Sequence, residues 1–509
     1  MLGQRYSGFV KLWLLLVLCL LFLMPAGAQW TQSLHFNSSD MALDLAEART
    51  FQKYPTYNHY LQMMQDFATN YPEICRLDTF GTSQEGRLLL ALKISDNVNE
   101  DEPEAGFLYT SSMHGNEILG YVLLLRLADT LLSGYGNDSE ITTLIDNLQI
   151  RINPLANPDG AYSADANTSL QHAVRQTADG TDLNRDFPDP KIEEADDTTG
   201  RAMENRFMME FLREHRFSMS ANLHSGEEVV NYPWDYTYDL HADDHWYRFI
   251  SHEYADEAMA VDPSYMFGWP DGGITNGALW YVARGTRQDY VNYYLGGREV
   301  TLELSMEFLL SSDELEQHWK INQRSLINYM GQCLYGIRGT VSDLDTGNPL
   351  RAEIRIPDHD SAYSVVHSSA AHGDFYRLIK EGVYDLVISS PGYQSDTIES
   401  VSVTDYQSTF LDIQLKPFGV SVTQEEEAAF SIYPNPAIHS FRVEPVNLSH
   451  GEVELSIYSM EGSLIYSNTH PWYGAGIEIS SDKMEAGIYL LRCTCGTFSE
   501  VLRLVLLNP

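Results

Sequence analysis

Four short segments of the sequence carry residue types that could bind a metal ion, hold a substrate and move a proton. His114 and Glu117 are three residues apart, and His224 follows at the end of an apolar run. Two imidazoles and one carboxylate form the ligand set of a catalytic zinc, which leaves a fourth position for water. On one helical turn, the spacing of His114 and Glu117 would place both side chains on one face. The plainer alternatives are a surface histidine with a first-turn glutamate, and a core histidine at 224.

The other two segments contain groups that suit a substrate. Asn184 and Arg185 pair an amide with a guanidinium, a natural set of donors for a carboxylate, although a solvated loop is the simpler interpretation. Glu303 lies in an apolar run, where a carboxylate is costly unless it has a role. Its alternative is the polar face of an edge strand, because Thr301, Glu303 and Ser305 alternate. Zinc, a carboxylate clamp and a base together predict cleavage of a peptide at its C-terminal end.

These segments fall in a region that alternates short apolar runs with helical patterns. Such a pattern predicts an α/β domain with a mixed, mostly parallel sheet flanked by helices. Ligands of these sheets bind at the carboxyl ends of strands, and His114, Asn153, His224 and Glu303 all fall at or near expected strand ends. The expected strands are 88–94, 106–111, 149–153, 218–223 and 300–304, and the expected helices are 58–70, 117–133, 201–214, 242–260 and 313–333.

Changes in composition and residue pattern along the sequence predict five consecutive parts. Arg5 and Lys11 precede an apolar run that ends in small residues, which is typical of a secretory signal peptide over 1–28. The α/β region occupies 29–335, a small antiparallel β-sandwich follows over 336–417, and an acidic linker over 418–429 leads to a second β domain over 430–509. After the signal peptide, no stretch is long and apolar enough to span a membrane.

Charge and cysteine content limit the classes of partner. The chain has 71 acidic and 32 basic residues, so its net charge of -39 disfavours nucleic acid and anionic membranes. Outside the signal peptide, four cysteines are too few for a disulfide scaffold. A Cys75–Cys333 bridge is possible, whereas Cys493 and Cys495 lie too close along one expected strand to bridge easily.

With these residues in order, the segment 88–335 resembles the zinc metallocarboxypeptidases. It is most similar to the regulatory branch that includes carboxypeptidases E, N, M and D. The resemblance implies that His114, Glu117 and His224 bind one Zn²⁺ per chain, as in the His-Glu-His site of carboxypeptidase A. It also implies that Asn184 and Arg185 hold the terminal carboxylate of the substrate.

The resemblance assigns further roles around this centre. Arg175 would stabilise the oxyanion, and Glu303 would be the general base. Tyr281 would be a mobile cap over the substrate, with Tyr290 as a second candidate whose spacing to Glu303 is too short. The segment NPDG at 157–160 matches another family segment with a structural role.

Two residues that match the family bear on substrate specificity, and two other residues differ from the family pattern. Asp235 matches the acidic residue that selects a C-terminal Lys or Arg, and Gln288 matches a polar residue of the same pocket. Asp186 stands where many relatives have asparagine. Arg287 puts a cation close to the expected pocket, where it could pair with Asp235.

The two β regions carry resemblances of their own. GDFY at 373–376 and PGY at 391–393 resemble the transthyretin-like domain that follows the catalytic domain in that branch. YPNP at 433–436 and GIY at 487–489 resemble the C-terminal sorting domain of the type IX secretion system. Together these two resemblances imply a protein secreted, or held at the cell surface, by a Gram-negative bacterium through its periplasm.

The secretion machinery and peptide C-termini would be the partners of this protein. The alternatives are a relative acting on cell-wall peptides and a non-catalytic zinc-binding adhesin.

Overall fold

The computed structural model describes residues 36–163, 167–193, 196–361, 363–418, 430–446, 451–460, 462–472, 476–495 and 498–507. The expected signal peptide and nearly all of the expected linker lie outside these residues. The chain divides into two compact units at residue 418, and each unit is described by itself.

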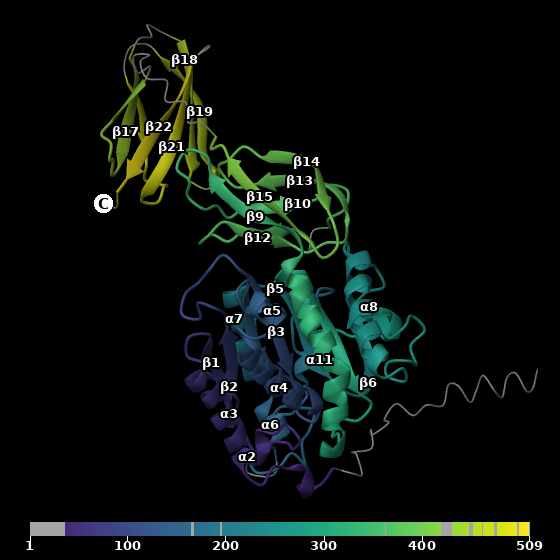
Figure 1. Ribbon diagram of the computed structural model, residues 1–509. Coiled ribbons are helices and arrows are strands. Elements are labelled where there is room, and N and C mark those ends of the chain that lie inside the picture. The colour runs from purple at the N-terminus through teal and green to yellow at the C-terminus, as the bar shows by residue number, and fades with distance from the viewer. Residues whose placement is uncertain are drawn as a thin grey trace, which may run out of the picture. The chain divides into compact units, whose positions relative to one another are not determined.

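The first unit is built on a mixed sheet flanked by helices (Figure 1). The sheet has eight strands in the order β1-β2-β4-β3-β5-β8-β6-β7. Its centre is parallel, from β4 through β3 and β5 to β8. Strands β1 and β2 are antiparallel to their neighbours, and β6 is antiparallel to β8. The strands are β1 (Cys75–Thr82), β2 (Leu88–Ile94), β3 (Ala105–Ser111), β4 (Leu148–Asn153), β5 (Phe217–His224), β6 (Glu227–Tyr232), β7 (Ile274–Asn276) and β8 (Glu299–Ser305).

Helices cover both faces of this sheet. The α-helices are α2 (Leu45–Ala48), α3 (Tyr57–Asn70), α4 (Leu119–Gly134), α5 (Ser139–Ile145), α6 (Pro158–Ala161), α7 (Met203–His215), α8 (Asp244–Val261), α9 (Gly277–Trp280), α10 (Arg287–Tyr294) and α11 (Leu315–Gly331), and the 3-10 helices are η1 (Ser38–Asp40), η2 (Leu183–Arg185), η3 (Ser312–Glu314) and η4 (Gln332–Leu334). Helices α3, α4, α8 and α11 share one apolar core with the sheet, and α7 and α10 share a second core. Adjacent residues Phe107 and Leu108 point into these two different cores, as the alternation of a strand requires.

The structure confirms the expected strands and helices to within a few residues, with one difference at the candidate site. Helix α4 begins at Leu119, so Glu117 is not helical. Instead the N–H of Glu117 donates to the carbonyl of His114 at 3.1 Å, which closes a turn ahead of the helix. Strands β1, β6 and β7 were not expected from the sequence. Much of β1 is only partly buried, so its residues lack a continuous apolar run.

Residues 336–417 form two small sheets, with the orders β11-β10-β13-β14 and β12-β9-β15. The expectation of an antiparallel sandwich is wrong at one pair, because β15 pairs with β9 in parallel in the second of these sheets. The strands are β9 (Gly336–Asp343), β10 (Glu353–Arg355), β11 (Val366–His367), β12 (Asp374–Arg377), β13 (Gly382–Ser389), β14 (Asp396–Val403) and β15 (Ser408–Leu415).

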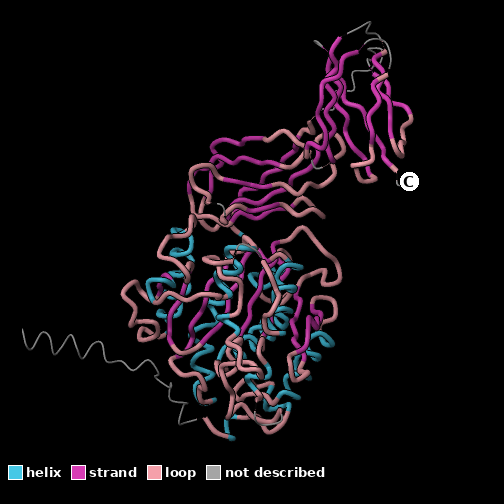
Figure 2. Tube along the Cα trace, turned by 180° about the vertical axis from the view of Figure 1, so that it is seen from behind, coloured by secondary structure: helices cyan, strands magenta, loops and turns pink. Residues whose placement is uncertain are grey.

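The second unit is another all-β domain with its own apolar core. Its two sheets have the orders β16-β17-β20 and β19-β18-β21-β22, seen as magenta strands in Figure 2. The strands are β16 (Phe430–Tyr433), β17 (Ser440–Pro445), β18 (Gly451–Ser459), β19 (Leu464–Trp472), β20 (Ile477–Ser480), β21 (Gly487–Cys495) and β22 (Phe498–Leu506).

The cysteines of the described residues are free thiols. Cys75 and Cys333 are both buried and do not form the bridge that seemed possible. Cys493 and Cys495 are also free. Among the helices that the structure describes, none combines the length and the apolar character needed to cross a bilayer.

Candidate active site

His114, Glu117 and His224 meet at the carboxyl end of the sheet and are all buried. Nδ1 of His114 lies 2.8 Å from Oε1 of Glu117, and Nδ1 of His224 lies 2.7 Å from Oε2. The two Nδ1 atoms are 3.1 Å apart. Ligands bound to one tetrahedral zinc are separated by about 3.4 Å, so the side chains need only small movements to bind the ion. The donor set and its spacing fit zinc.

The charge states of these groups favour metal binding. Burial lowers the pKa of His224 to about 4, so its ring is neutral near pH 7 and can act as a ligand. Burial opposes the charge of Glu117, but the two histidines hold the pKa of Glu117 below its ordinary value. The backbone N–H of Ser225 also donates to Oε2 of Glu117 at 3.1 Å.

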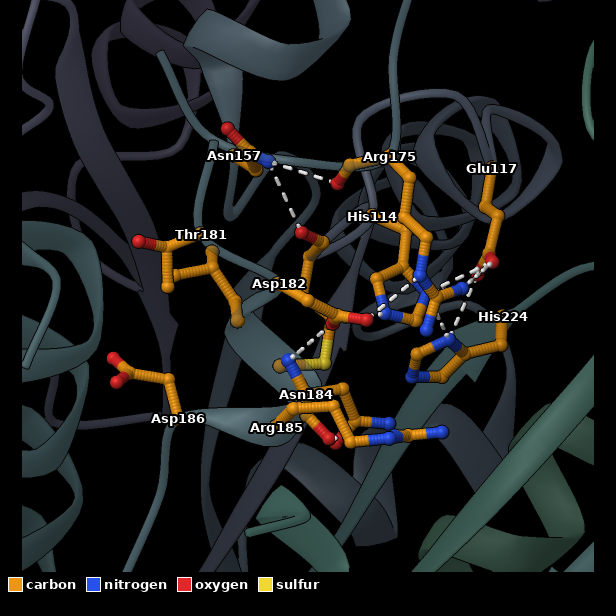
Figure 3. A network of polar contacts seen from close by, with 12 residues as sticks. His114, Glu117, Asn157, Arg175, Thr181, Asp182, Asn184, Arg185, Asp186 and His224 are labelled. Carbon is orange, nitrogen blue, oxygen red and sulfur yellow. Dashed lines mark hydrogen bonds and ion pairs between the residues drawn. The ribbon is translucent and has the colours of Figure 1, made fainter. Parts of the chain in front are cut away.

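Asp182 and Arg175 flank the three candidate ligands (Figure 3). Oδ1 of Asp182 lies 3.1 Å from Nε2 of His114, on the side of the ring opposite Glu117. Arg175 donates to Oδ2 of Asp182 at 2.9 Å and reaches Oε1 of Glu117 at 3.4 Å. A carboxylate on the second ring nitrogen of a metal-binding histidine fixes its tautomer and orientation. Asp182 is therefore a supporting residue that sequence reasoning missed.

Asn222 is a second residue that the sequence did not reveal. It lies in β5, and its side-chain amide is 2.6 Å from Nε2 of His224. Each candidate histidine thus has one ring nitrogen toward Glu117 and the other toward a polar neighbour. Asn222 is two residues before His224, and residues two apart on a strand share a face. That alternation was the available signal.

Strand register places Glu303 beside the candidate metal ligands. Strand β8 lies between β5 and β6, and Glu303 is the partner of His224 in the parallel β5–β8 pair. Paired residues of neighbouring strands point to the same face, so Glu303 faces the site. The edge-strand alternative is wrong, because β8 is interior. Burial and the nearby charge of Glu117 raise the pKa of Glu303 well above its usual range, and its Oε2 is buried without a partner.

Asn184 and Arg185 lie in η2, directly after Asp182. The carbonyl of Asn184 accepts from Arg185 Nη1 at 2.6 Å, and Oδ1 of Asn184 accepts from the N–H of Arg287 at 3.0 Å. Arg185 is exposed, and its guanidinium carbon is 5.9 Å from the ring centre of Tyr281. Tyr281 is 49% exposed at the end of α9. Arg185 and Tyr281 therefore contact each other where both are exposed to solvent.

Asp235 and Gln288 are brought together in a buried, hydrogen-bonded cluster. Nε2 of Gln288 donates to Oδ1 of Asp235 at 3.1 Å, and Nδ2 of Asn231 donates to the same oxygen at 3.1 Å. Gly277 closes over this carboxylate, since a Cβ at that position would overlap Oδ1. Burial raises the pKa of Asp235.

Arg287 does not pair with Asp235, which corrects the expectation from the sequence. Its Nη2 donates to Oε2 of Glu299 at 2.8 Å, and its Nη1 bonds Thr110. Both Arg287 and Glu299 are fully buried. Asp235 therefore keeps no cationic partner among the described side chains.

Two other sequence features prove to be structural. Tyr290 is fully buried, with its ring 5.2 Å from that of Phe187, so it is no mobile cap. Asp186 points away from the candidate ligands (Figure 3) and accepts from the N–H of Ala202 at 2.9 Å and from Asn205 at 3.1 Å.

The segment at 157–160 joins the pieces of the site. Nδ2 of Asn157 donates to the carbonyl of Met113 at 3.2 Å and reaches that of Arg175 at 3.4 Å. Gly115 packs directly on Gly160, where an added Cβ would overlap the backbone. These contacts hold the turn at His114 against the loop segment that contains Arg175.

Comparison with protein families matches all three regions of the chain. A zinc carboxypeptidase model matches residues 60–325, and a carboxypeptidase regulatory-like domain model matches residues 336–416. A secretion system C-terminal sorting domain model matches residues 431–506.

Curated relatives agree with these matches. Carboxypeptidase D of Homo sapiens is 35% identical over 358 residues, which cover 67% of this chain and 25% of that protein. The chain thus matches about a quarter of the length of that relative. Carboxypeptidase SOL1 of Arabidopsis thaliana is 34% identical, with 68% of this chain and 69% of that protein covered. The carboxypeptidase N catalytic chain of Rattus norvegicus is 33% identical, with 71% of this chain and 85% of that protein covered. These matches confirm the resemblance read from the sequence, and the chain belongs to the zinc carboxypeptidase family.

Proposed function

We propose that this protein is an exported, zinc-dependent metallocarboxypeptidase that releases the C-terminal amino acid from peptides or proteins, with a preference for Lys and Arg. The observation that carries the proposal is the meeting of His114, Glu117 and His224 beside Glu303, with Asn184 and Arg185 in the neighbouring η2. A metal centre, a base and a carboxylate clamp are the parts that hydrolysis at a free C-terminus needs.

Substrate recognition would begin at the terminal carboxylate. Arg185 presents an exposed guanidinium, and Nδ2 of Asn184 is left for the substrate because Oδ1 already accepts from the backbone of Arg287. Charge-assisted bonds to a carboxylate are strong and directional. Tyr281, whose hydroxyl lies 3.4 Å from Nη2 of Arg185, would close over the bound end. An internal peptide bond offers no such carboxylate, which favours exopeptidase action.

His114, Glu117 and His224 would hold the zinc ion, which lowers the pKa of a bound water and polarises the scissile carbonyl. Glu303 would accept the proton of the attacking water at its unpartnered Oε2 and then deliver it to the leaving amine. Arg175 would face the negative charge that develops on the carbonyl oxygen. Asp182, through its bonds to His114 and Arg175, would hold both in position.

Specificity for a basic residue would come from Asp235. A buried carboxylate without a cationic partner is costly, and a substrate ammonium or guanidinium would neutralise it. An apolar C-terminal side chain would leave it unpaired. The pairing of Arg287 with Glu299 supports this, since Arg287 does not cancel the charge of Asp235.

Export is inferred from the two ends of the chain. The residues 1–28 have the pattern of a signal peptide, and the match at 431–506 is to a secretion sorting domain. We place the protein outside the cell or at the surface of a Gram-negative bacterium, reached through the periplasm. The residues 336–416 would be a transthyretin-like module attached to the enzyme.

The test uses the purified protein and matched peptides that differ only in the last residue, Arg, Lys, Leu or Phe, together with a C-terminally amidated Arg peptide. We expect release of free Arg and Lys, slower release of Leu and Phe, and no cleavage of the amide. A chelator should abolish activity, and zinc should restore it. Cleavage of the amidated peptide, or chelator-resistant activity, would contradict the proposal.

A matched variant separates specificity from activity. Asp235→Ala should abolish the preference for basic residues, so that kcat/KM for the Arg and Lys peptides falls toward the value for the Leu peptide. The Leu peptide should still be cleaved. An unchanged preference would refute the role of Asp235 and leave the carboxypeptidase assignment intact.

A further inference from the structure

The loop between strands β10 and β11 of the regulatory-like domain packs on the catalytic domain at two buried anchors. The first anchor is Asp243, just ahead of α8. Its carboxylate accepts from both Nη atoms of Arg377 at 2.8 Å and lies 2.8 Å from Nε2 of His359. Asp243 and Arg377 are fully buried. Removing one partner from a buried ion pair leaves an uncompensated charge, so this anchor is fixed in the folded protein.

The second anchor lies five residues further along the loop. Nη2 of Arg298, just ahead of β8, donates to the carbonyl of Ser364 at 2.8 Å. The same guanidinium contacts Asp243, so both anchors share one charge network. The hydroxyl of Ser364 donates to Asp360 at 2.8 Å, which ties the two ends of the loop together.

Tyr363 lies between these anchors and stacks on Tyr293 of helix α10. The ring centroids are 3.6 Å apart and the planes differ by 23°. On the other side, the ring of Tyr293 lies 6.2 Å from Trp234 and 6.2 Å from Tyr236. These two residues flank Asp235. One tyrosine of the regulatory-like domain therefore stacks on a ring that contacts both neighbours of Asp235.

Helix α10 also holds Asp235 from its other end. Gln288 donates to Oδ1 of Asp235, and Oδ1 of Asp289 accepts from the N–H of Asp235 at 2.9 Å. The helix is short, from Arg287 to Tyr294, and is capped by Thr286, whose hydroxyl accepts from the N–H of Asp289. Because the helix is short and capped at its first turn, we expect a shift at Tyr293 to displace Gln288 and Asp289 as well.

We propose that Tyr363 of the regulatory-like domain is a positioning residue for the substrate pocket: by stacking on Tyr293 it braces α10 and so holds Asp235 and Gln288 in their binding arrangement. The inference rests on the proposed function for the role of Asp235 as the carboxylate that meets the substrate side chain. It assigns to the regulatory-like domain an indirect part in substrate binding, through Tyr293 and α10.

The test compares Tyr363→Ala and Tyr363→Phe with a matched control in the same domain. Tyr406 also contacts the catalytic domain, with its ring 5.7 Å from that of Phe249 on α8 and its hydroxyl bonded to Glu253 of the same helix. Tyr406→Ala therefore removes an aromatic contact between the domains away from the pocket. The full-length, zinc-loaded protein is used for each variant.

Two readouts are measured. The first is the KM and kcat for the peptide that wild type cleaves best. An aromatic pair contributes enough that we expect Tyr363→Ala to raise KM about 2- to 10-fold, with kcat within about twofold. Tyr363→Phe keeps the stack but loses the hydrogen bond of its hydroxyl to Tyr293, so its KM should lie closer to wild type than that of Tyr363→Ala. Tyr406→Ala should change neither constant.

The second readout is hydrogen exchange of the peptides that cover residues 231–236 and 287–294, which needs no activity. We expect faster exchange in Tyr363→Ala only. Unchanged exchange in that variant overturns the inference, and so does an equal increase in Tyr406→Ala or in Tyr363→Phe. If wild type releases no C-terminal residue, the proposed function fails while the exchange data still decide whether Tyr363 braces α10.

Discussion

At the scale of single residues, the site gives its two glutamates different surroundings. The carboxylate of Glu117 lies within hydrogen-bond distance of both histidine rings and accepts from the N–H of Ser225, so its charge is stabilised. Glu303 is its neighbour in the same buried region, and the pKa of Glu303 is raised by burial and by the charge of Glu117. Two carboxylates with different environments take different roles: one suits metal binding and the other proton transfer.

Replacing Glu303 by Gln should stop turnover without loss of zinc. The amide keeps the size of the side chain but cannot accept and deliver the proton, so kcat should fall by at least about 10²-fold. Metal analysis and kcat on the purified variant check this. His224→Ala is the paired comparison, because it should lose zinc as well as activity. Near-normal turnover in Glu303→Gln would remove the residue from the mechanism.

At the scale of elements, turns and strand register bring distant residues together. The β5–β8 pairing places Glu303 next to His224, and the turn ahead of α4 places His114 against α6. The glycine pair Gly115 and Gly160 allows the close approach of that turn to α6, since a Cβ on Gly115 would overlap backbone atoms.

Gly115→Ala should therefore displace the His114 turn and weaken metal binding and activity together. Overpacking of this kind typically costs about 1–3 kcal/mol. Gly331→Ala is the control, since Gly331 ends helix α11 with no atom near its Cβ position, and alanine there should be neutral or stabilising. Zinc affinity and melting temperature are measured for both variants. Equal behaviour of the two would contradict the packing argument.

The segment between β6 and α8 should make the protein sensitive to acid. His241 is buried, and its Nδ1 accepts from the N–H of Asp243 at 2.9 Å. Burial lowers its pKa to about 3. Because the folded value lies below the unfolded value of about 6.5, the unfolded chain binds a proton first as pH falls. The stabilising contribution of neutral His241 is thus complete above about pH 6.5 and is lost progressively toward pH 3.

Thermal melts of wild type and His241→Asn at pH 7 and pH 4.5 measure this effect. The loss from His241 alone is about 3 kcal/mol at pH 4.5. Asparagine can still accept the N–H of Asp243 but has no proton to bind in this range, so the variant should lose less stability on acidification. A drop in melting temperature of the same size in both proteins would exclude His241 as a source.

At the scale of the whole molecule, the regulatory-like domain and the catalytic domain form one compact unit, and the sorting-like domain forms another. The first pair share the buried network of Asp243, Arg298 and Arg377. The second unit has its own apolar core, which includes Phe441, Leu455 and Leu491. Separate cores predict independent folding, whereas a shared buried charge network predicts that the first two domains fold together.

A chain that ends at Phe418 should fold and cleave peptides with the kcat/KM of the longer protein. In its native host it should remain in the periplasm, because the sorting-like domain is missing. A chain that ends at Tyr335 is the contrasting variant, since it leaves Asp243 and Arg298 without Arg377 and should be insoluble or unstable. Loss of activity in the longer truncation, or its arrival at the cell surface, would contradict these roles.

The sequence by itself determined the chemistry of the candidate site. The residue types and spacing of His114, Glu117 and His224, the pair Asn184–Arg185 and the isolated Glu303 predicted a metal centre, a clamp and a base. Apolar periodicity located the central strands and major helices because it reflects burial along one element. The order of domains also followed from local residue patterns, since short alternating runs bounded by turn residues differ from long helical patterns.

Tertiary structure alone decided which residues face one another. Asp182 behind His114, Thr110 beside Arg287, the interior position of β8 and the stack of Tyr363 on Tyr293 all join segments far apart in the chain. No local pattern encodes such pairs, because they depend on strand register and on how helices pack. Even Glu117, whose spacing suggested a helix, lies in a turn, because the chain must bend there to pack Gly115 on Gly160.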